Sequence, residues 1–358
     1  MSLMDKLKKN STIKETSILS KSTLFNEKDM VQTEVPMVNV ALSGRIDGGL
    51  TPGLTMWAGP SKHFKSAFSL LMAKSYMDKY KDAVMLFYDS EFGTPKKYFE
   101  TFDIDMDRVL HTPLTDIEQL KVDIMNQLKD IARGDKVIIV VDSIGNLASK
   151  KEVDDAIEGK SVADMSRAKQ VKSLFRMVTP HLTLKDIPMV VVNHTYKTME
   201  MYAKDVVGGG TGSYYSADNI FILGRQQEKD TTGITGYNFV INVEKSRYVR
   251  EKSKILITVD FETGIQKYSG LLDVAIEGNF VQKPSPGWYA KVDLETGEVG
   301  DKVRFDKTQS SEFWNDILKN EQFKEFVRKK YEIAYGSIMG DSEVTTEDIL
   351  EEEQESEV

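Results

Sequence analysis

The stretch MWAGPSKHFKSAF, from Met56 to Phe68, decides how the rest of this chain is interpreted. A loop that binds phosphate groups reads G-x-x-x-x-G-K-[ST], with a buried strand before it and a helix after it. Gly59, Lys65 and Ser66 stand at the first glycine, the lysine and the hydroxyl residue of that pattern. Phe64 takes the place of the second glycine, so the motif is incomplete. Alone it is a weak signal, because three such residues at this spacing often arise by chance.

The flanking sequence strengthens the motif. Residues 54–59, LTMWAG, form a continuous apolar run typical of a strand buried on both faces, and a helical pattern begins at Lys65. In that setting the N–H groups at the start of the helix point at a bound phosphate. We expect Lys65 to reach the β- and γ-phosphates of a nucleotide and Ser66 to offer its hydroxyl to Mg²⁺. The remaining residues of the expected nucleotide-binding loop are Gly59, Pro60, Ser61, Lys62, His63 and Phe64.

Phe64 is the unusual residue of this loop. A phenylalanine is permitted there if its φ is negative and its ring does not occupy the space of the phosphates. The substitution alone therefore does not inactivate the loop, but the geometry of a standard loop cannot be assumed.

The segments beyond the loop alternate between strand and helix patterns. Apolar runs at 84–91, 137–143 and 189–196 predict further buried strands, and helical spacing is found at 65–80, 116–132 and 161–184. This alternation predicts an α/β fold, a mostly parallel sheet with helices on both faces. The segments YNFVINVEKS and KILITVDF indicate antiparallel strands at one edge of the sheet. After Tyr268 a helix, a hairpin and a serine-capped helical segment predict a small C-terminal α/β domain.

A second phosphate-site element lies about 80 residues after the loop. The run KVIIVVDS is an apolar strand that ends in Asp142. An aspartate at the carboxyl end of such a strand holds the Mg²⁺ of a bound nucleotide. We therefore expect Asp142 and Ser66 to be the metal ligands, with a hydroxyl added by Ser143; the alternative is that Asp142 only caps the next segment.

Composition narrows the possible functions. The chain has 358 residues, a net charge of −9 and no cysteine, which excludes disulfides, thiol nucleophiles and cysteine zinc sites. Residues 341–358 contain nine acidic and no basic residues, so residues 1–340 are neutral overall. Such a tail is usually solvated, and sometimes it competes with a polyanion for a basic groove. The N-terminus does not resemble a signal peptide, and the longest apolar runs are far too short to span a bilayer, so we expect a cytoplasmic protein without membrane contact.

Several segments together resemble one family. GPSKHFKS, YDSEFG, VIIVVDSIGNLASKKE, MVVVNHTY, GGGTG and VEKSR stand in the order and spacing of RecA-like recombinases, and they look most like the UvsX-type recombinases of bacteriophages. The resemblance runs from about residue 25 to about residue 335 and includes a phenylalanine at the second glycine of the loop. It implies a RecA-like P-loop ATPase that forms a helical filament on single-stranded DNA. With ATP and Mg²⁺ such a filament pairs with homologous duplex DNA and exchanges strands in phage recombination, repair and replication.

The resemblance also implies roles for residues around the nucleotide. Glu91 ends the YDSE strand, where the family has a glutamate that polarises the attacking water. Tyr98 stands where bacterial members stack a ring on adenine, although a tyrosine of the core is nearly as good an explanation. His194 takes the place of a glutamine that senses the γ-phosphate; an imidazole can donate one hydrogen bond to a phosphate oxygen.

Two further sets of residues follow from the resemblance. The second DNA-binding loop would run from Tyr196 to about Ser213, and the first would lie within residues 150–163. The residues expected to bind DNA in the second loop are Lys197, Tyr202, Lys204, Gly208, Gly209 and Gly210. Arg167, Lys169 and Lys172 either assist them or form a solvated helix face. Lys245 and Arg247 alternate on one strand and would act across the filament interface on the γ-phosphate of the neighbouring subunit.

We expect four parts of the chain: an oligomerisation segment (1–35), the ATPase core with its DNA-binding loops (36–269), a small C-terminal domain (270–335) and an acidic disordered tail (336–358). The expected partners are single-stranded and duplex DNA, further copies of the chain, a single-strand-binding protein and a recombination mediator. Two alternatives stay open. Phe64 and His194 are compatible with a RecA-fold assembly factor that binds nucleotide without hydrolysis, and the fold is also that of hexameric helicases.

Overall fold

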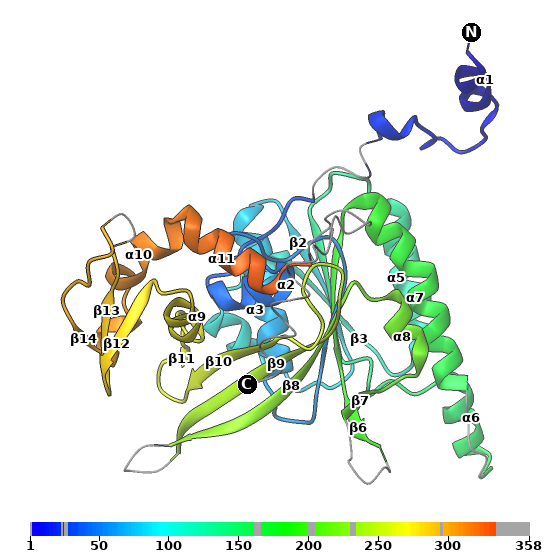
Figure 1. Ribbon diagram of the computed structural model, residues 1–358. Coiled ribbons are helices and arrows are strands. Elements are labelled where there is room, and N and C mark those ends of the chain that lie inside the picture. The colour runs from blue at the N-terminus through cyan, green and yellow to red at the C-terminus, as the bar shows by residue number, and fades with distance from the viewer. Residues whose placement is uncertain are drawn as a thin grey trace, which may run out of the picture.

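The computed structural model describes residues 2–22, 24, 28–160, 166–198, 205–229, 234–293 and 296–333. A nine-stranded sheet forms its centre, in the order β11-β10-β9-β8-β1-β5-β4-β2-β3 (Figure 1). These strands are β1 (Gly53–Ala58), β2 (Val84–Asp89), β3 (Val109–Pro113), β4 (Val137–Asp142), β5 (Pro188–Asn193), β8 (Asn219–Lys229), β9 (Ile234–Ser246), β10 (Lys254–Asp260) and β11 (Gly264–Ile265).

The strands from β8 to β3 are parallel, and those from β8 to β11 are antiparallel. Ala58 pairs with Asn193 and Asp89 pairs with Asp142, so the carboxyl ends of β1, β5, β2 and β4 lie at one edge. Every residue of β1, β4 and β5 is buried, as their continuous apolar runs predicted. The α/β class and the antiparallel edge are confirmed.

Helices cover both faces of the sheet. One core, which contains Trp57 and Phe68, lies under α3 (Lys65–Lys79) and α2 (Pro36–Ser43). The other, which contains Ile124 and Phe175, lies under α5 (Ile117–Asp130) and α7 (Ser166–Lys185). Neighbouring strand residues alternate between the two cores, as Trp57 and Met56 do, because side chains of a strand point to opposite faces.

The C-terminal part is a small unit beside the antiparallel edge (Figure 1). It contains α9 (Leu271–Glu277), the antiparallel sheet of β12 (Val281–Ser285), β13 (Trp288–Lys291) and β14 (Val303–Arg304), then α10 (Ser311–Lys319) and α11 (Glu321–Tyr331). The serine cap is Ser310, which accepts the N–H of Phe313. Asn320 divides the predicted helical segment in two, because its side chain caps α11 by accepting the N–H of Phe323 at 3.0 Å. Arg328 of α11 pairs with Asp47 at 2.9 Å, which ties this unit to the core.

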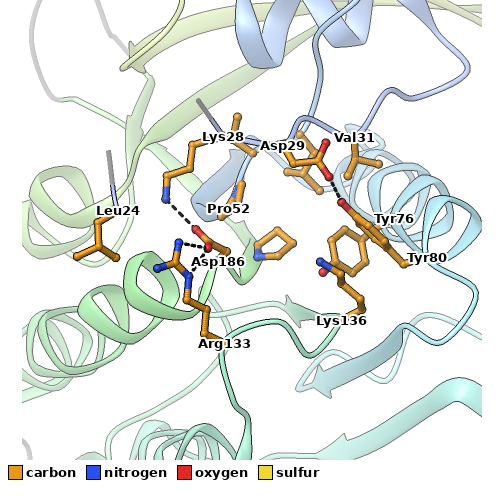
Figure 2. A pocket seen from close by; sticks show the side chains of 13 residues that line it. Leu24, Lys28, Asp29, Val31, Pro52, Tyr76, Tyr80, Arg133, Lys136 and Asp186 are labelled. Atoms are coloured by element: carbon orange, nitrogen blue, oxygen red, sulfur yellow. Dashed lines mark hydrogen bonds and ion pairs between the residues drawn. The ribbon is translucent and has the colours of Figure 1, made fainter. Parts of the chain in front are cut away.

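The N-terminal segment is attached to the core from Lys28 onward. Lys28 and Arg133 both pair with Asp186, and the hydroxyl of Tyr80 donates to Asp29 (Figure 2). Val31 and Val35 are buried in the core on α3. In contrast, α1 (Leu3–Asn10) contains no buried residue. The proposed boundary at residue 35 stays a prediction, and these contacts favour a separable part that ends nearer to residue 28.

The remaining described elements are short. They are α4 (Lys96–Thr101), α6 (Lys150–Ile157), α8 (Thr211–Ser216), the hairpin of β6 (Thr195–Lys197) and β7 (Asp205–Val207), and 3₁₀ turns at Leu19–Lys21, Met106–Arg108 and Phe305–Gln309. In the part of the chain that the structure describes, no helix is both long and apolar enough to cross a bilayer.

Candidate nucleotide-binding and hydrolysis site

A cavity of about 430 Å³ opens at the carboxyl edge of the parallel strands. The loop between β1 and α3 forms one wall, residues beyond β2 and β5 form a second, and residues of β8, β9 and β10 form a third. The structure thus brings together Lys65, Ser66, Glu91, Tyr98 and His194, which lie far apart in the sequence. Parallel strands position them, because their ends meet at one edge.

Lys65 begins α3 and is buried, with 6% of its surface exposed. Its Nζ donates to the carbonyl of Pro60 at 2.8 Å, so the side chain folds back over the loop. Burial lowers the pKa of Lys65, while Glu91 and Asp142 raise it. The ammonium group therefore lies inside the loop, where the phosphates of a nucleotide would be held.

The backbone conformation of Phe64 differs from the one that the sequence suggested. Its φ is +63° and its ψ is +16°, so the backbone is left-handed, as a glycine would adopt, and the expectation of a negative φ was wrong. Its ring stacks on Phe239 at 5.2 Å between centroids and meets Phe68 edge-on at 6.0 Å. A non-glycine residue in this region costs roughly 1–2 kcal/mol. The aromatic packing offsets that cost and keeps the loop shape without the second glycine.

This balance predicts an order of stability at position 64. Phe64→Gly removes the backbone strain but loses the ring contacts, and we expect a net loss of about 1–3 kcal/mol in the free energy of unfolding. Phe64→Ala loses the ring and keeps the strain, so it should be less stable than the glycine variant by about 1 kcal/mol. Urea unfolding of the three proteins measures the order. An alanine variant more stable than the glycine variant would contradict a left-handed Phe64.

Asp142 lies at the end of β4 and is 3% exposed. Burial raises the pKa of Asp142 to about 6, and a hydrogen bond from Ser66 lowers it. Thr94 Oγ1 lies 3.4 Å from Asp142 Oδ2, whereas Oδ1 is buried and lacks a hydrogen-bond partner. A buried carboxylate oxygen without a partner beside a serine hydroxyl fits a hydrated Mg²⁺, which binds through one or two protein oxygens and the phosphates. These residues therefore fit the predicted metal site.

Asp142 also gives the ligand-free protein a pH-dependent stability. Because the folded state raises its pKa from 3.8 to about 6, the folded state binds this proton more tightly than the unfolded state. The contribution of this proton to the free energy of unfolding is complete below about pH 4 and is lost as the pH rises through about 6. In protein free of nucleotide and divalent cations, Asp142→Asn should raise the free energy of unfolding by about 1–3 kcal/mol at pH 7.5 and hardly change it at pH 4. Urea unfolding at both pH values measures this, with exposed Asp130→Asn as the control; an equal effect at both would contradict the assignment.

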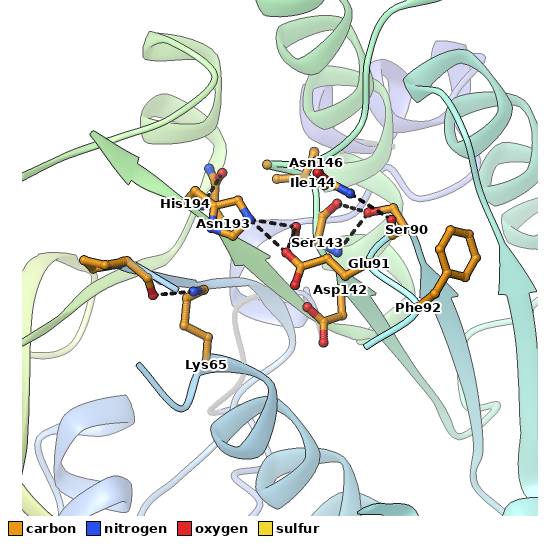
Figure 3. A network of polar contacts seen from close by, with 12 residues as sticks. Lys65, Ser90, Glu91, Phe92, Asp142, Ser143, Ile144, Asn146, Asn193 and His194 are labelled. Atoms are coloured by element: carbon orange, nitrogen blue, oxygen red, sulfur yellow. Dashed lines mark hydrogen bonds and ion pairs between the residues drawn. The ribbon is translucent and has the colours of Figure 1, made fainter. Parts of the chain in front are cut away.

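Glu91 is held by a polar network at the second wall of the cavity (Figure 3). Its Oε1 lies 2.8 Å from His194 Nε2 and accepts the hydroxyl of Ser143 at 2.6 Å. The hydrogen bond with His194 is the main cause that lowers the pKa of Glu91 to about 2, against burial, which raises it. The carboxylate is thus ionised at neutral pH. A base this weak can orient and polarise a water molecule.

The network continues behind Glu91 through residues that the sequence did not single out. Ser90 donates its hydroxyl to the carbonyl of Ser143 at 2.6 Å, and Asn146 donates to the carbonyl of Ser90 at 3.0 Å. Asn193 accepts the N–H of His194 at 2.8 Å and donates to the carbonyl of Gly208 at 2.9 Å. The Glu91–His194 pair is therefore joined directly to the predicted second DNA-binding loop. Only the position of Asn193 before a candidate histidine could have signalled it.

Other residues of the cavity were also missed. Arg225 of β8 donates to the carbonyl of Lys62 at 3.0 Å, and its guanidinium lies 4.5 Å from the ring centroid of Tyr237. Phe261, which follows β10, lines the cavity and is 59% exposed. Tyr98 lines it too, while packing on Phe102 and the core, so both interpretations of this ring remain compatible with its position. His63 is held by the carbonyl of Ser61 at 2.9 Å, and burial lowers its pKa.

The predicted interface cations lie beside α8. Lys245 Nζ donates to the carbonyls of Tyr214 at 2.6 Å and Ala217 at 2.8 Å. Arg247 Nε pairs with Asp218 at 2.6 Å. Both side chains thus meet the turn between α8 and β8 of their own subunit.

The predicted DNA-binding residues are described only in part. Lys197 lies on β6 and pairs with Asp205 at 2.9 Å. Gly208, Gly209 and Gly210 follow β7, and a Cβ at Gly210 would lie 3.6 Å from Ala168 of α7. Tyr202, Lys204 and the acidic tail lie outside the described residues. The predicted first loop forms α6 at its start, and residues 161–165 at its end are outside the described part.

Comparison with known proteins agrees with this geometry. Residues 19–266 match the RecA N-terminal domain, and residues 268–327 match the C-terminal domain of the bacteriophage T4 recombination and repair protein. The chain is 52% identical to the recombination and repair protein of Enterobacteria phage T4 over 340 residues, which cover 93% of this chain and 86% of that protein. It is 23% identical to protein RecA of Paracoccus denitrificans over 255 residues, 70% of this chain and 69% of that protein. The chain therefore belongs to the RecA family, in the group of the phage T4 recombination and repair protein.

Proposed function

We propose that this chain is an ATP-dependent recombinase, which assembles on single-stranded DNA and catalyses homologous pairing and strand exchange in phage recombination, repair and recombination-dependent replication. One observation carries the proposal. Lys65 and Glu91 line one cavity at the carboxyl edge of a RecA-like sheet, and Asp142 lies behind its lining residues Ser66 and Thr94, each in an environment that suits its role. Membership of the recombination and repair group supports the DNA part of the proposal.

In this mechanism the substrate is Mg·ATP. The loop residues Gly59 to Phe64 direct backbone N–H groups at the phosphates, and Lys65 neutralises charge on the β- and γ-oxygens. Ser66 and Asp142 would hold the Mg²⁺ that accompanies the nucleotide, and this cation would neutralise charge that develops on the phosphates. Glu91 orients the attacking water, and Tyr98 lies against the base. His194 and Ser143 both contact Glu91 Oε1. If the imidazole of His194 turned to the γ-phosphate of a bound nucleotide, the carboxylate of Glu91 would be free to bind the attacking water.

Hydrolysis is proposed to depend on the filament. Lys245 and Arg247 would approach the γ-phosphate held by the neighbouring subunit, as arginine fingers do. In the described subunit these cations hold carbonyls and a carboxylate at the end of α8. Turnover by isolated subunits would therefore be slow, and DNA that organises the filament would stimulate it. The exposed α1 and the segment that follows it are proposed to pack on the adjacent subunit.

DNA would be bound at the second loop by Lys197, Tyr202, Lys204 and Gly208 to Gly210, with duplex DNA as the second substrate. A single-strand-binding protein and a recombination mediator are the further proposed partners, and the host cytoplasm is the proposed location. We keep the predicted division into an oligomerisation segment (1–35), the core (36–269), a C-terminal domain (270–335) and an acidic tail (336–358), although the burial of Val31 and Val35 favours a first boundary nearer to residue 28.

The DNA contacts predict a strong dependence on salt. If loop lysines neutralise phosphates, the affinity for single-stranded DNA should fall steeply as salt rises, because counterions are released on binding. Lys197→Ala should weaken binding and reduce the slope of log affinity against log salt by about one. Fluorescence anisotropy with an oligonucleotide measures both. A slope unchanged by Lys197→Ala would remove this lysine from the contact.

Strand exchange tests the proposed function itself. The full-length protein, ATP and Mg²⁺ are incubated with a single strand and a labelled homologous duplex. We expect transfer of the complementary strand only when the sequences are homologous. A hexameric helicase would instead separate any duplex regardless of homology, and an assembly factor would do neither.

A further inference from the structure

Arg167 stands four residues beyond the predicted first DNA-binding loop, in the first turn of α7. Its guanidinium group is hydrogen-bonded to backbone carbonyls of the same chain. Nε donates to the carbonyl of Leu147 at 2.8 Å, and Nη2 donates to the carbonyls of Ile144 at 3.0 Å and Gly145 at 2.9 Å. Three of its five N–H donors therefore hold backbone of the segment 144–147.

That segment supports the hydrolysis network from behind. It directly follows Ser143, whose hydroxyl donates to Glu91. A Cβ built on Gly145 would lie 2.4 Å from His194 Cδ2, so the imidazole rests against this glycine. Asn146 of the same segment donates to Ser90. A shift of these carbonyls would therefore move the surface on which both Ser143 and His194 are positioned.

The predicted second DNA-binding loop packs on the first two turns of α7, which also carry Arg167. A Cβ at Gly209 would lie 3.5 Å from Val171, and one at Gly212 would lie 2.5 Å from the Cβ and 2.6 Å from the Cα of Lys172. Contacts this close leave no room for a side chain at Gly212. The start of α7 thus contacts both the glycines of the second loop and the segment 144–147. In the sequence, α7 begins three residues after the end of the predicted first loop. In Figure 1, α6, α7 and α8 form one layer beside the sheet.

We propose that Arg167 is a positioning residue, which couples the start of α7, and through it both DNA-binding loops, to the Glu91–Ser143–His194 network. The proposal rests on the proposed function, because it concerns how DNA stimulates hydrolysis. DNA that orders either loop displaces or fixes the first turns of α7, and Arg167 transmits this to the carbonyls of the segment 144–147. In contrast, Lys129 of α5 is exposed.

The test compares full-length wild type with Arg167→Met, Arg167→Lys and the control Lys129→Met, which removes one exposed charge from α5. Steady-state ATP hydrolysis is measured with and without saturating oligo-dT, together with the KM for ATP and the oligo-dT affinity in a non-hydrolysable ATP analogue. A misplacement of about 1 Å costs a reaction up to about 100-fold. For Arg167→Met we therefore expect the DNA-stimulated kcat to fall about 10- to 100-fold, with KM and DNA affinity within about threefold of wild type.

Two controls separate this coupling from other roles. Lys129→Met should keep the wild-type kcat at saturating DNA. Arg167→Lys should be intermediate, because one ammonium group cannot reproduce a fork that spans three carbonyls. If Arg167→Met does not fold, as judged by circular dichroism, Arg167→Lys carries the test.

Three results would overturn the inference: an unchanged DNA-stimulated kcat in Arg167→Met, full stimulation in Arg167→Lys, or a DNA affinity at least tenfold weaker with normal kcat at saturation. The last would make Arg167 a phosphate ligand, and its salt slope would be smaller than that of wild type. A wild type that DNA does not stimulate would instead mark failure of the proposed function.

Discussion

ATP hydrolysis by the Lys65→Ala variant is expected to fall about 100- to 1000-fold. The ammonium group is buried in the loop, 2.8 Å from the carbonyl of Pro60, and nothing else among the described loop residues can place a charge there in the same way. Charge that develops on the γ-phosphate in the transition state loses its stabilisation when that cation is removed. Steady-state hydrolysis with saturating Mg·ATP and single-stranded DNA measures the effect.

A matched substitution shows whether the loss is specific to this lysine. Lys81→Ala removes one cation just beyond the far end of α3, where the side chain is 80% exposed, and should leave turnover within about twofold of wild type. The Lys65→Ala protein should keep its unfolding midpoint to within a few degrees. Unchanged turnover in Lys65→Ala would refute the assignment of the nucleotide site.

The second large effect is expected for Glu91→Gln. An amide keeps an oxygen that accepts the hydroxyl of Ser143 but removes the negative charge that polarises water. Loss of a positioned base typically costs 10²- to 10⁴-fold, and we expect a fall in kcat of that order. Nucleotide affinity should change by less than about threefold, because Glu91 is assigned to the water and not to the phosphates.

Separate measurements of binding and chemistry check this prediction. Affinity for a fluorescent ATP analogue reports binding, and a single-turnover experiment reports the hydrolysis step. Glu100→Gln, an exposed substitution on α4, serves as the control. A Glu91→Gln protein that binds nucleotide poorly but hydrolyses bound ATP at the normal rate would move Glu91 from the water to the nucleotide.

Much of the sheet could be predicted because its strands are buried on both faces. The sequences that form β1, β4 and β5 are long apolar runs. Each can therefore be recognised as a buried strand without knowing which strands lie beside it. β3 was missed because its sequence, VLHTP, is short and lies at the edge, where most of its residues are exposed. An edge strand such as β3 is not buried on both faces, so it lacks the continuous apolar run by which a buried strand is recognised in a sequence.

The nucleotide site was predictable to the level of residues, and its connections were not. Lys65 and Asp142 are found from a motif and from strand ends. The carbonyls of Leu147 and Ile144 that Arg167 holds lie 20 and 23 positions away in the sequence, and the carbonyl of Gly208 that Asn193 holds lies 15 positions away, so no local pattern contains these contacts. The left-handed Phe64 escaped prediction because its compensation, the ring of Phe239, lies on a distant strand.

The structure bears on the alternative of an assembly factor without hydrolysis. Phe64 motivated that alternative, but its half-buried ring packs against the core on Phe239, while Lys65 keeps its buried position. His194, the other residue that suggested this alternative, is in direct contact with Glu91. A chain that only bound nucleotide would have no need for a carboxylate held ionised beside the cavity.

Steady-state ATP hydrolysis with Mg²⁺, measured with and without single-stranded DNA, decides whether this chain is a DNA-dependent ATPase. We predict slow turnover by the protein alone and stimulation by DNA of at least tenfold, because the proposed mechanism completes the site with cations from a neighbouring subunit. Nucleotide binding without hydrolysis in either condition would contradict the account and would make the loop GPSKHFKS a binding element only.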